Sequence, residues 1–205
     1  MKLKYYYHCV DDINILSKYE NEEYYKEWFK IVYPILKNKE FQKRRLFMHH
    51  ENESLWTHSI KVSYESFKYA KKHNINTYNC ALAGILHDFY TKAWQYSSSL
   101  ELLDDKYKER FIKGKEKGLK NAHGITHPID ALNNSRKYFK RYLNEKIEDA
   151  IVTHMFPLSL LTDYKFPKYK ESLVITMIDK KVSMNILVNV KAISKYVGLY
   201  KLNSK

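Results

Sequence analysis

Apolar residues recur along much of this chain every three or four positions, the period of a helix that buries one face. In the range 54–73, Leu55, His58, Val62 and Ser66 fall on one side at this spacing. The same pattern predicts helices over 20–37, 54–73, 77–88, 128–143, 145–155 and 170–197. Strands at regular spacing with turn clusters between them are not visible. We therefore expect an all-α fold.

Turn-forming residues are scarce, which bears on the domain organisation. The 205 residues contain five glycines and four prolines, and no stretch is rich enough in them to be a linker. We expect one compact helical bundle over 1–205, to which the first 40 residues and the segment after Met184 add further helices. Pro128 is placed to be an early helical residue, and two later prolines indicate a loop over 157–168.

The chain is strongly basic, with 36 Lys and Arg against 23 Asp and Glu and a formal net charge of +13. This balance is typical of proteins with anionic partners such as nucleotides, nucleic acid or phosphorylated metabolites. The abundance of Lys, Asn, Ile and Tyr is equally what an AT-rich genome encodes, so both explanations stay open. No apolar run approaches the about 18 residues of a membrane span, and a signal-peptide core is absent. Cys9 and Cys80 do not have the spacing of a metal site or a redox motif, so we expect the protein to lie in the reducing cytoplasm. Because no membrane span is predicted, we expect no membrane partner.

Histidine and aspartate residues interrupt several of the predicted apolar helices. They are His58, His87, Asp88, His123, His154 and Asp179. Taken alone, a histidine on an apolar face is usually a hydrogen-bonded core residue, and a lone aspartate is usually a cap or an ion-pair partner. Six such groups in one chain instead indicate convergence on one interior metal site, because burying unpaired polar groups is costly. Imidazole and carboxylate without thiolate suit Fe, Mn, Co, Ni or Zn, with Mg also possible.

The order of these residues resembles that of a known family. His58, then the adjacent pair His87 and Asp88, then Asp179 resembles the H…HD…D motif of the HD superfamily of metal-dependent phosphohydrolases, an all-α fold. The resemblance covers about residues 47–184. The stretches MHHENESLWTHS, LHDF, HGITHP, THMFPL and ESLVITMIDK are similar to those of bacterial, Firmicutes-type HD proteins without an assigned substrate.

The resemblance implies a cofactor of one or two divalent or transition metal ions. The first ion would be held by His58, His87, Asp88 and Asp179. The second would share Asp88 as a bridge and add His123 and His154, as in HD-GYP cyclic-dinucleotide phosphodiesterases and HD-type diadenosine tetraphosphate hydrolases. Metal binding lowers the pKa of water from about 15.7 towards about 7, and Asp88 would have the catalytic role of orienting the resulting hydroxide.

His127 leaves one part of this assignment open. It follows His123 by four residues, one helical turn if the segment is helical. It could replace His123 as a ligand or contact a substrate phosphate.

Other candidates for binding substrate phosphate lie outside the ligand set. They are His50 and Arg45, with their neighbours His49 and Arg44, and Lys180, which follows Asp179. Arginine suits bidentate contact with phosphate. The alternative is a solvated basic turn in KRRLFMHH and an exposed lysine.

The chain departs from the family pattern in two places. Many HD proteins carry lysine three residues after the aspartate, where this chain has Thr91, with Lys92 one position later. The Gly-Tyr-Pro motif of HD-GYP proteins is absent, which argues against a cyclic-di-GMP substrate.

The function expected from the resemblance is hydrolysis of a phosphoester or phosphoanhydride in a nucleotide-like small molecule. An HD-type nuclease would use the same metal residues, so the sequence does not separate the two. A non-catalytic nucleic-acid or nucleotide-binding module around a structural metal is a further alternative, suggested by the basic charge and the 19 tyrosines. The spread of the charge along the chain weakens that alternative.

Overall fold

The computed structural model describes residues 10–47, 53–91, 123–164 and 166–184, and within these ranges the chain is helical without a strand. The α-helices are α1 (Val10–Tyr19), α2 (Tyr25–Leu36), α3 (Lys39–Gln42), α4 (Leu55–Lys72), α5 (Thr77–Leu86), α7 (His123–Phe139), α8 (Glu145–Thr153) and α9 (Lys170–Met184). Three short 3-10 helices are η2 (Lys43–Leu46), η6 (Lys140–Tyr142) and η7 (Leu158–Leu161). The expected all-α fold class is confirmed.

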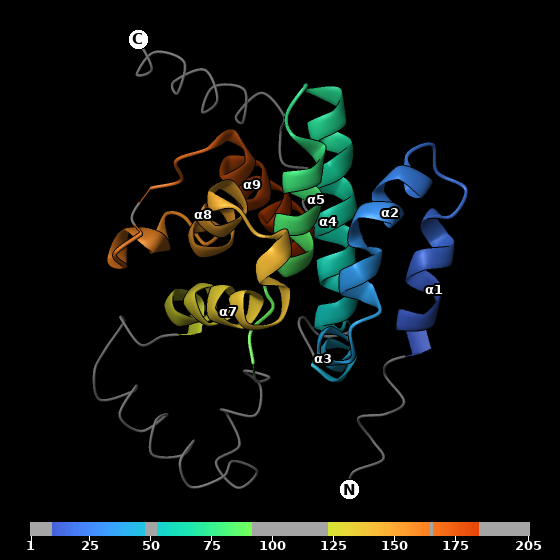
Figure 1. Cartoon of the computed structure of the whole chain (residues 1–205), viewed down its shortest axis with the longest axis horizontal. Helices are drawn as coiled ribbons and strands as arrows, with labels where there is room; N and C mark the ends of the chain where they lie inside the picture. The colour runs from blue at the N-terminus through green and yellow to red at the C-terminus, as the bar shows by residue number, and fades with distance from the viewer. Residues whose placement is uncertain (1–9, 48–52, 92–122, 165, 185–205) are drawn as a thin grey trace, which may run out of the picture.

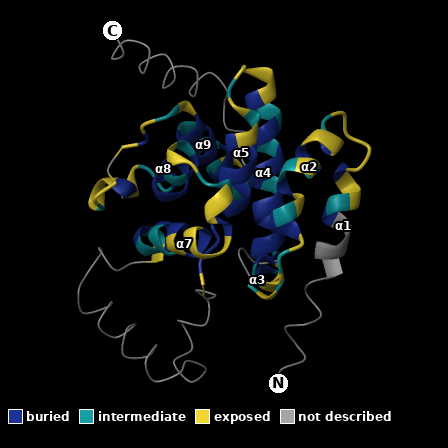
Figure 2. Ribbon diagram, viewed as in Figure 1, coloured by how far each residue is buried: buried dark blue, intermediate teal, exposed yellow. Residues whose placement is uncertain are grey.

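Helices α4 and α5 form the centre of the molecule. Figure 1 shows α1 and α2 on one side of this pair and α7, α8 and α9 on the other. The ribbons of α4 and α5 are buried over most of their length, whereas the outer helices are exposed on the side that faces away from them (Figure 2). One apolar core joins side chains from α1 through α9, with Trp28, Trp56 and Phe89 among the largest that are fully buried.

The close approach of α4 and α5 depends on Gly84. A Cβ atom at this position would lie 2.7 Å from the Cα atom of Ser63, so no larger residue fits without a shift of the backbone. The Ser63 hydroxyl accepts a hydrogen bond from the Trp28 indole at 2.9 Å and donates one to the Ala81 carbonyl at 2.7 Å. These contacts set the position of α5 and therefore of the His-Asp pair that follows it.

Short polar side chains begin several helices, as the sequence pattern suggests. Ser54 accepts a hydrogen bond from the Thr57 amide, Asn76 from the Asn79 amide, and Asn144 from the two amides at the start of α8. Such caps satisfy backbone donors that have no partner inside the helix. The predicted ranges 54–73, 77–88 and 145–155 agree with α4, α5 and α8 to within two residues at each end.

Helix α7 differs from its prediction. It begins at His123, five residues before the expected start, and Pro128 lies inside it rather than at its first turn. Proline lacks the amide that would bond the carbonyl four residues earlier. The buried side chains of Ile125, His127 and Pro128 offset this loss by packing on the interior, so tertiary burial outweighs the local preference.

Two other predicted ranges also differ from the structure. Helix α2 begins at Tyr25, later than the expected residue 20, and the predicted loop 157–168 contains the 3-10 helix η7. The predicted extension of the last helix to residue 197 lies outside the described residues.

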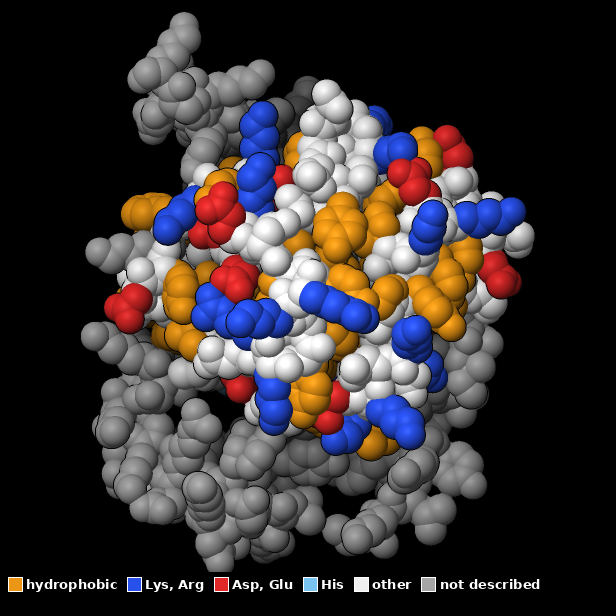
Figure 3. All heavy atoms as spheres, in the orientation of Figure 1, with side chains coloured by type: hydrophobic (Ala, Val, Ile, Leu, Met, Phe, Trp, Pro, Cys, Tyr) orange, Lys and Arg blue, Asp and Glu red, His pale blue; other side chains and the backbone are white. Residues whose placement is uncertain are grey.

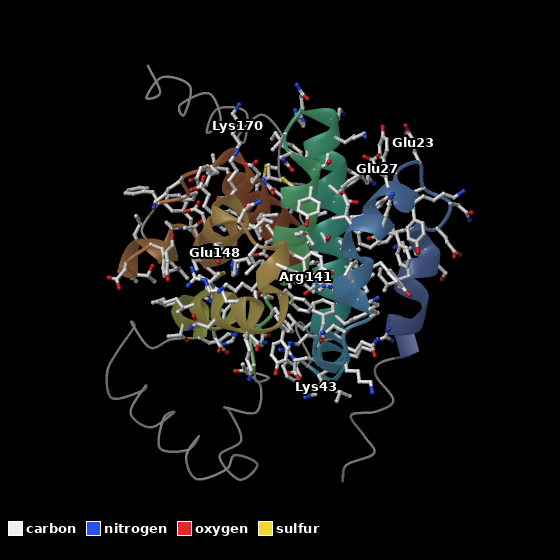
Figure 4. The ribbon with its side chains drawn as sticks, viewed as in Figure 1. Glu23, Glu27, Lys43, Arg141, Glu148 and Lys170 are labelled. Atoms are coloured by element: carbon white, nitrogen blue, oxygen red, sulfur yellow. The ribbon has the colours of Figure 1, made fainter. Side chains whose placement is uncertain are left out.

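Ion pairs join the outer helices to their neighbours. Lys71 of α4 bonds Glu27 of α2 at 2.8 Å, and Arg136 of α7 bonds Glu148 of α8 through its Nε at 2.9 Å. Figure 4 labels Glu27 and Glu148 near the surface, on opposite sides of the molecule. Exposed ion pairs of this kind contribute only about 0–1 kcal/mol each to the free energy of unfolding, so most of the stability comes from the buried core.

Candidate metal centre

Six side chains of metal-ligand type converge in the interior from five helices or their ends. They are His58 of α4, His87 and Asp88 just after α5, His127 of α7, His154 just after α8, and Asp179 of α9. All six are buried, with between 0% and 7% of their surface exposed. Local sequence explains two of the placements, because α5 and α8 end in apolar turns directly before His87 and His154.

Backbone carbonyls fix the orientation of three of the imidazole rings. The Nδ1 atom of His87 bonds the Gly84 carbonyl at 2.8 Å, that of His127 the His123 carbonyl at 2.7 Å, and that of His154 the Ile151 carbonyl at 2.7 Å. A carbonyl only accepts, so each Nδ1 must carry the proton. In the neutral rings each Nε2 therefore presents a lone pair to the centre, the tautomer that a metal ligand requires.

The first ligand group consists of His58, His87, the Oδ2 atom of Asp88, and Asp179. Nε2 of His58 lies 3.0 Å from Oδ1 of Asp179 and 4.0 Å from Oδ2 of Asp88. Nε2 of His87 lies 3.4 Å from the same Asp88 oxygen and 3.5 Å from Oδ1 of Asp179.

The second ligand group consists of His127, His154 and the Oδ1 atom of Asp88. Nε2 of His127 lies 3.1 Å from this oxygen, and Nε2 of His154 lies 3.4 Å from it. The two Nε2 atoms are 2.9 Å apart. The two oxygens of Asp88 thus face different groups, which makes this carboxylate the link between them.

These atoms fit a bound cation. Donor atoms around one ion at about 2.0–2.2 Å are separated by roughly 3.0–3.5 Å, close to the distances within each group. Nε2 of His87 and Oδ1 of Asp88 are buried without a hydrogen-bond partner, which is costly in the absence of an ion. The buried sets His58, His87, Asp179 and His87, Asp88, His154 could each hold a metal ion.

The carboxylates of the centre stay charged despite their burial. Burial by itself would raise the pKa of Asp88, but the facing rings of His87 and His127 outweigh it and hold that pKa well below its usual range. Asp179 behaves in the same way, because the facing rings of His58 and His87 outweigh burial and lower its pKa. The centre therefore presents two negative charges to whatever cation occupies it.

The pKa values of His87 and His154 are shifted in opposite directions. Burial favours the neutral ring of His87, yet the charges of Asp88 and Asp179 outweigh burial and raise the pKa of His87 to about 9. Burial lowers the pKa of His154. Without a metal, the ring of His87 is therefore charged beside the two carboxylates, whereas the ring of His154 stays neutral.

Of the two histidines near the start of α7, it is His127 that faces Asp88. The ring of His123 is exposed and stacks on that of His127, with centroids 4.7 Å apart. The sequence placed His123 in the ligand set, with His127 four residues later as the alternative. In the structure the His123 carbonyl holds the His127 ring, whose Nε2 atom lies 3.1 Å from Oδ1 of Asp88.

The expected phosphate-binding side chains have other contacts in the structure. The Arg45 guanidinium lies over the Trp56 ring at 4.2 Å, and the Lys180 ammonium donates a hydrogen bond to the Phe156 carbonyl. His50 lies outside the described residues. Thr91, which stands where the family motif has lysine, bonds Asp130 of α7 through both its amide and its hydroxyl, at 2.9 and 2.8 Å.

One buried residue beside the centre, Tyr90, was not predicted from the sequence to be a site residue. Tyr90 makes edge contacts with the rings of His123 and His127, with centroids 5.1 and 5.8 Å apart. Arg44, which the sequence offered as a possible phosphate-binding neighbour of Arg45, is fully buried, so the alternative of a solvated basic turn in KRRLFMHH is wrong for this residue. The signal for Arg44 was its place three residues after Phe41, a core residue, on one face of a short helical segment.

Comparison with known proteins yields no match, whether to a family model, to a curated protein or to a solved structure. Among the described helices, none has the length and apolar character needed to cross a membrane.

Proposed function

We propose that this chain is a metal-dependent phosphohydrolase of the HD type. The observation that carries the proposal is the pair of ligand groups joined by Asp88, with six buried side chains aimed at one interior region. The order of the ligands along the chain, His58, His87, Asp88 and Asp179, supports it through the resemblance noted above.

The chain's own residues would position and charge this site. Three Nδ1 hydrogen bonds to carbonyls hold the rings with Nε2 inward, so little reorganisation is needed on metal binding. Asp88 would serve both groups, and Asp179 would complete the first. Bound divalent ions supply a water of lowered pKa and positive charge for the oxygens of a phosphate.

The substrate class proposed is a phosphorylated small molecule of nucleotide type. The net charge of +13 favours anionic substrates. A nuclease acting on polymer ends would use the same six residues and is the alternative within this enzyme class. Only the products formed from matched substrates distinguish the two.

A nucleic-acid-binding role is the second candidate function, and one surface feature favours it. An open groove of about 860 Å³ lies between the end of α2 and the end of α7. Its basic lining residues are Lys37, Lys39, Lys137, Lys140 and Arg141, and Glu40 is the acidic residue among those that line it. Exposed Tyr138 adds an aromatic surface on which a base could stack. Figure 3 shows the Lys and Arg side chains of this face interspersed with apolar ones rather than gathered in one stripe, and Figure 4 labels Arg141 near its middle.

The test of the enzyme proposal is metal content followed by a substrate panel. Protein purified without chelators is analysed for Fe, Mn, Co, Ni and Zn, then assayed on mononucleotides, dinucleotides, nucleoside polyphosphates and short oligonucleotides. We expect about two ions per chain and release of phosphate or nucleotide from small substrates. A chain that binds no metal, and stays inactive after incubation with each ion, would contradict the proposal.

The variant Asp88→Asn is compared with a matched control, Asp163→Asn. Asp163 is an exposed aspartate on the loop after α8. Both variants remove one carboxylate charge, but only Asp88→Asn removes a proposed ligand. Retained cleavage of oligonucleotides with no turnover of small molecules would favour the nuclease. Salt-sensitive binding of oligonucleotides without cleavage, lost on Lys137→Ala, would favour the binding role.

A further inference from the structure

Arg44 is a buried cation whose hydrogen bonds are incomplete. None of its side chain is exposed. Its Nη1 atom bonds the Glu40 carbonyl at 3.1 Å and reaches the Glu40 carboxylate at 3.4 Å. Its Nε and Nη2 atoms are buried without a partner. Guanidinium remains charged in proteins, so burying these two donors without a partner destabilises the folded state.

Glu40 does not neutralise this charge well. Its other carboxylate oxygen bonds Lys43 at 2.6 Å, a much shorter contact than the one with Arg44. Figure 4 labels Lys43 beside the ribbon of α3, at the lower edge of the molecule. Asp130 also acts on Arg44 electrostatically, but its Oδ2 already accepts two hydrogen bonds from Thr91. Lys43 and Arg44 therefore share the carboxylate of Glu40.

The free edge of Arg44 has the geometry of an oxyanion receptor. Nε and Nη2 are the two donors of the guanidinium whose N–H bonds run parallel, and this edge receives phosphate or carboxylate in a bidentate manner. Aromatic rings hold the plane: Phe89 lies 4.3 Å from Cζ and Phe47 lies 4.9 Å from it. The edge is thus preorganised for a ligand that the described residues do not supply.

Tyr90 brings a further unsatisfied donor to the same region. Its hydroxyl is buried without a partner, and its ring stacks with Phe47 at 6.3 Å between centroids. The Phe47 ring contacts both the Tyr90 ring and the Arg44 guanidinium, which brings these two side chains to one region. The Tyr90 ring also meets that of His127, 5.8 Å away.

We propose that the Nε–Nη2 edge of Arg44 and the hydroxyl of Tyr90 form a binding position for a phosphate group beside the metal centre. Arg44 stacks on Phe89 and Phe47 rather than on the six ligand-type residues, so this phosphate is not the one attacked. Resting on the proposed function, this assigns the substrate to molecules that carry a second phosphoryl group besides the scissile one. Phe47 is half-buried and forms the outer wall of the position.

The test uses inorganic phosphate as the probe and protein freed of metal by chelation. Thermal unfolding is followed as phosphate is added at constant ionic strength, with chloride as the reference anion. We expect the Tm of the wild type to rise with phosphate and to level off, because a ligand of the native state alone stabilises it. We expect Arg44→Met to abolish the rise and Tyr90→Phe to weaken phosphate binding by about 10-fold or less.

The matched control is Arg45→Met, which removes the same charge from the neighbouring residue and should leave the response to phosphate intact. Arg44→Met should also keep or raise the Tm in phosphate-free buffer, because it removes a buried charge that lacks a partner. If Arg44→Met does not fold, Tyr90→Phe and Arg44→Lys carry the test, the latter losing the bidentate contact. No phosphate-specific rise in the wild type, or an equal rise in Arg44→Met, would overturn the proposal.

Failure of this proposal is distinguishable from failure of the proposed function. Metal content and turnover are measured on separate samples, and phosphate binding is measured without metal. If turnover is found, Arg44→Lys should raise KM by about 10- to 100-fold for substrates with two phosphoryl groups and leave KM for single-phosphate substrates unchanged. An equal effect on both substrate types would contradict the assignment while leaving the hydrolase intact.

Discussion

The Nε2 atoms of His127 and His154 lie 2.9 Å apart, while the Nδ1 atom of each ring faces a backbone carbonyl. Because both Nδ1 atoms carry the proton, the two Nε2 atoms meet as acceptors in the neutral rings. Oδ1 of Asp88 lies 3.1 Å from one and 3.4 Å from the other. Three acceptor atoms this close repel one another unless a proton or a metal cation lies among them, so this triangle is where metal binding should be tested first.

His127→Ala should remove one metal position and His123→Ala should not. The expected metal content falls from about two ions per chain to about one in His127→Ala, because the Nε2 atom of His127 lies 3.1 Å from Oδ1 of Asp88. Turnover, where found, should fall by more than about 100-fold, since even outer-shell partners of metal ligands cost about 10- to 100-fold. Metal analysis of both variants with the wild type checks this. Loss of metal in His123→Ala with retention in His127→Ala would reverse the assignment.

Asp88→Asn should affect both ligand groups at once. Its carboxylate contacts His87 on one side and the His127–His154 pair on the other. We expect metal content to fall below one ion per chain, whereas His58→Ala should leave the second group able to bind. Competition with a coloured chelator gives the affinities. Two ions retained by Asp88→Asn would argue that each group binds independently of the bridge.

Metal binding near pH 7 should release a proton from the chain. The carboxylates of Asp88 and Asp179 raise the pKa of His87 to about 9 in the metal-free protein, so its ring is charged below that pH. A metal ion displaces this proton, and the number released should fall towards zero as the pH rises through 9. Calorimetric titration with Mn²⁺ or Zn²⁺ in buffers of different ionisation enthalpy measures the release. A release that does not change between pH 7 and pH 10 would contradict the charged state of His87.

In the metal-free protein the same shift has a consequence for stability. The pKa of His87 is raised on folding, so its contribution is fully present below the ordinary histidine pKa of about 6.5 and is lost as the pH rises through about 9. Denaturant unfolding of the chelated protein across this range should show the decline, and His87→Gln should flatten it.

Gly84→Ala should destabilise the fold although alanine is the better helix former. The new Cβ would meet the backbone of Ser63 at 2.7 Å and of Val62 at 3.2 Å, which forces α4 and α5 apart. Overpacking of this kind costs about 1–3 kcal/mol. Gly124→Ala is the matched control, because its Cβ would meet side-chain atoms at 3.5 and 3.6 Å, in ordinary contact. Equal stability of the two variants in chemical denaturation would show that α5 can shift without cost.

Cys80 should resist thiol reagents until the protein unfolds. Its side chain is fully buried, and burial raises the pKa of the thiol to about 12, so almost no thiolate forms near pH 8. The assay is thiol titration of a Cys9→Ser variant in buffer and in guanidinium chloride. Rapid modification in buffer would indicate that α5 opens locally in the native state.

The sequence by itself determined the helical class and indicated histidines and aspartates as candidate metal ligands. Apolar residues recur every three or four positions, and glycines and prolines are few. This pattern is a local property of the sequence, because it shows which face of each helix avoids water. Caps such as Ser54 and Asn76 are local as well, and the ranges they begin were predicted to within two residues. Buried histidines and aspartates within apolar runs were recognisable because an unpaired polar group in a core is costly.

Only the tertiary structure decided which of these residues meet. In α7 the burial of Ile125 and His127 outweighs the local effect of Pro128, and His127 faces Asp88 whereas the ring of His123 is exposed. Arg44 and Arg45 are neighbours of one type in the sequence, yet one is buried between Phe47 and Phe89 and the other lies over Trp56. Such choices depend on contacts between segments far apart in the chain, and no local pattern of residues contains them.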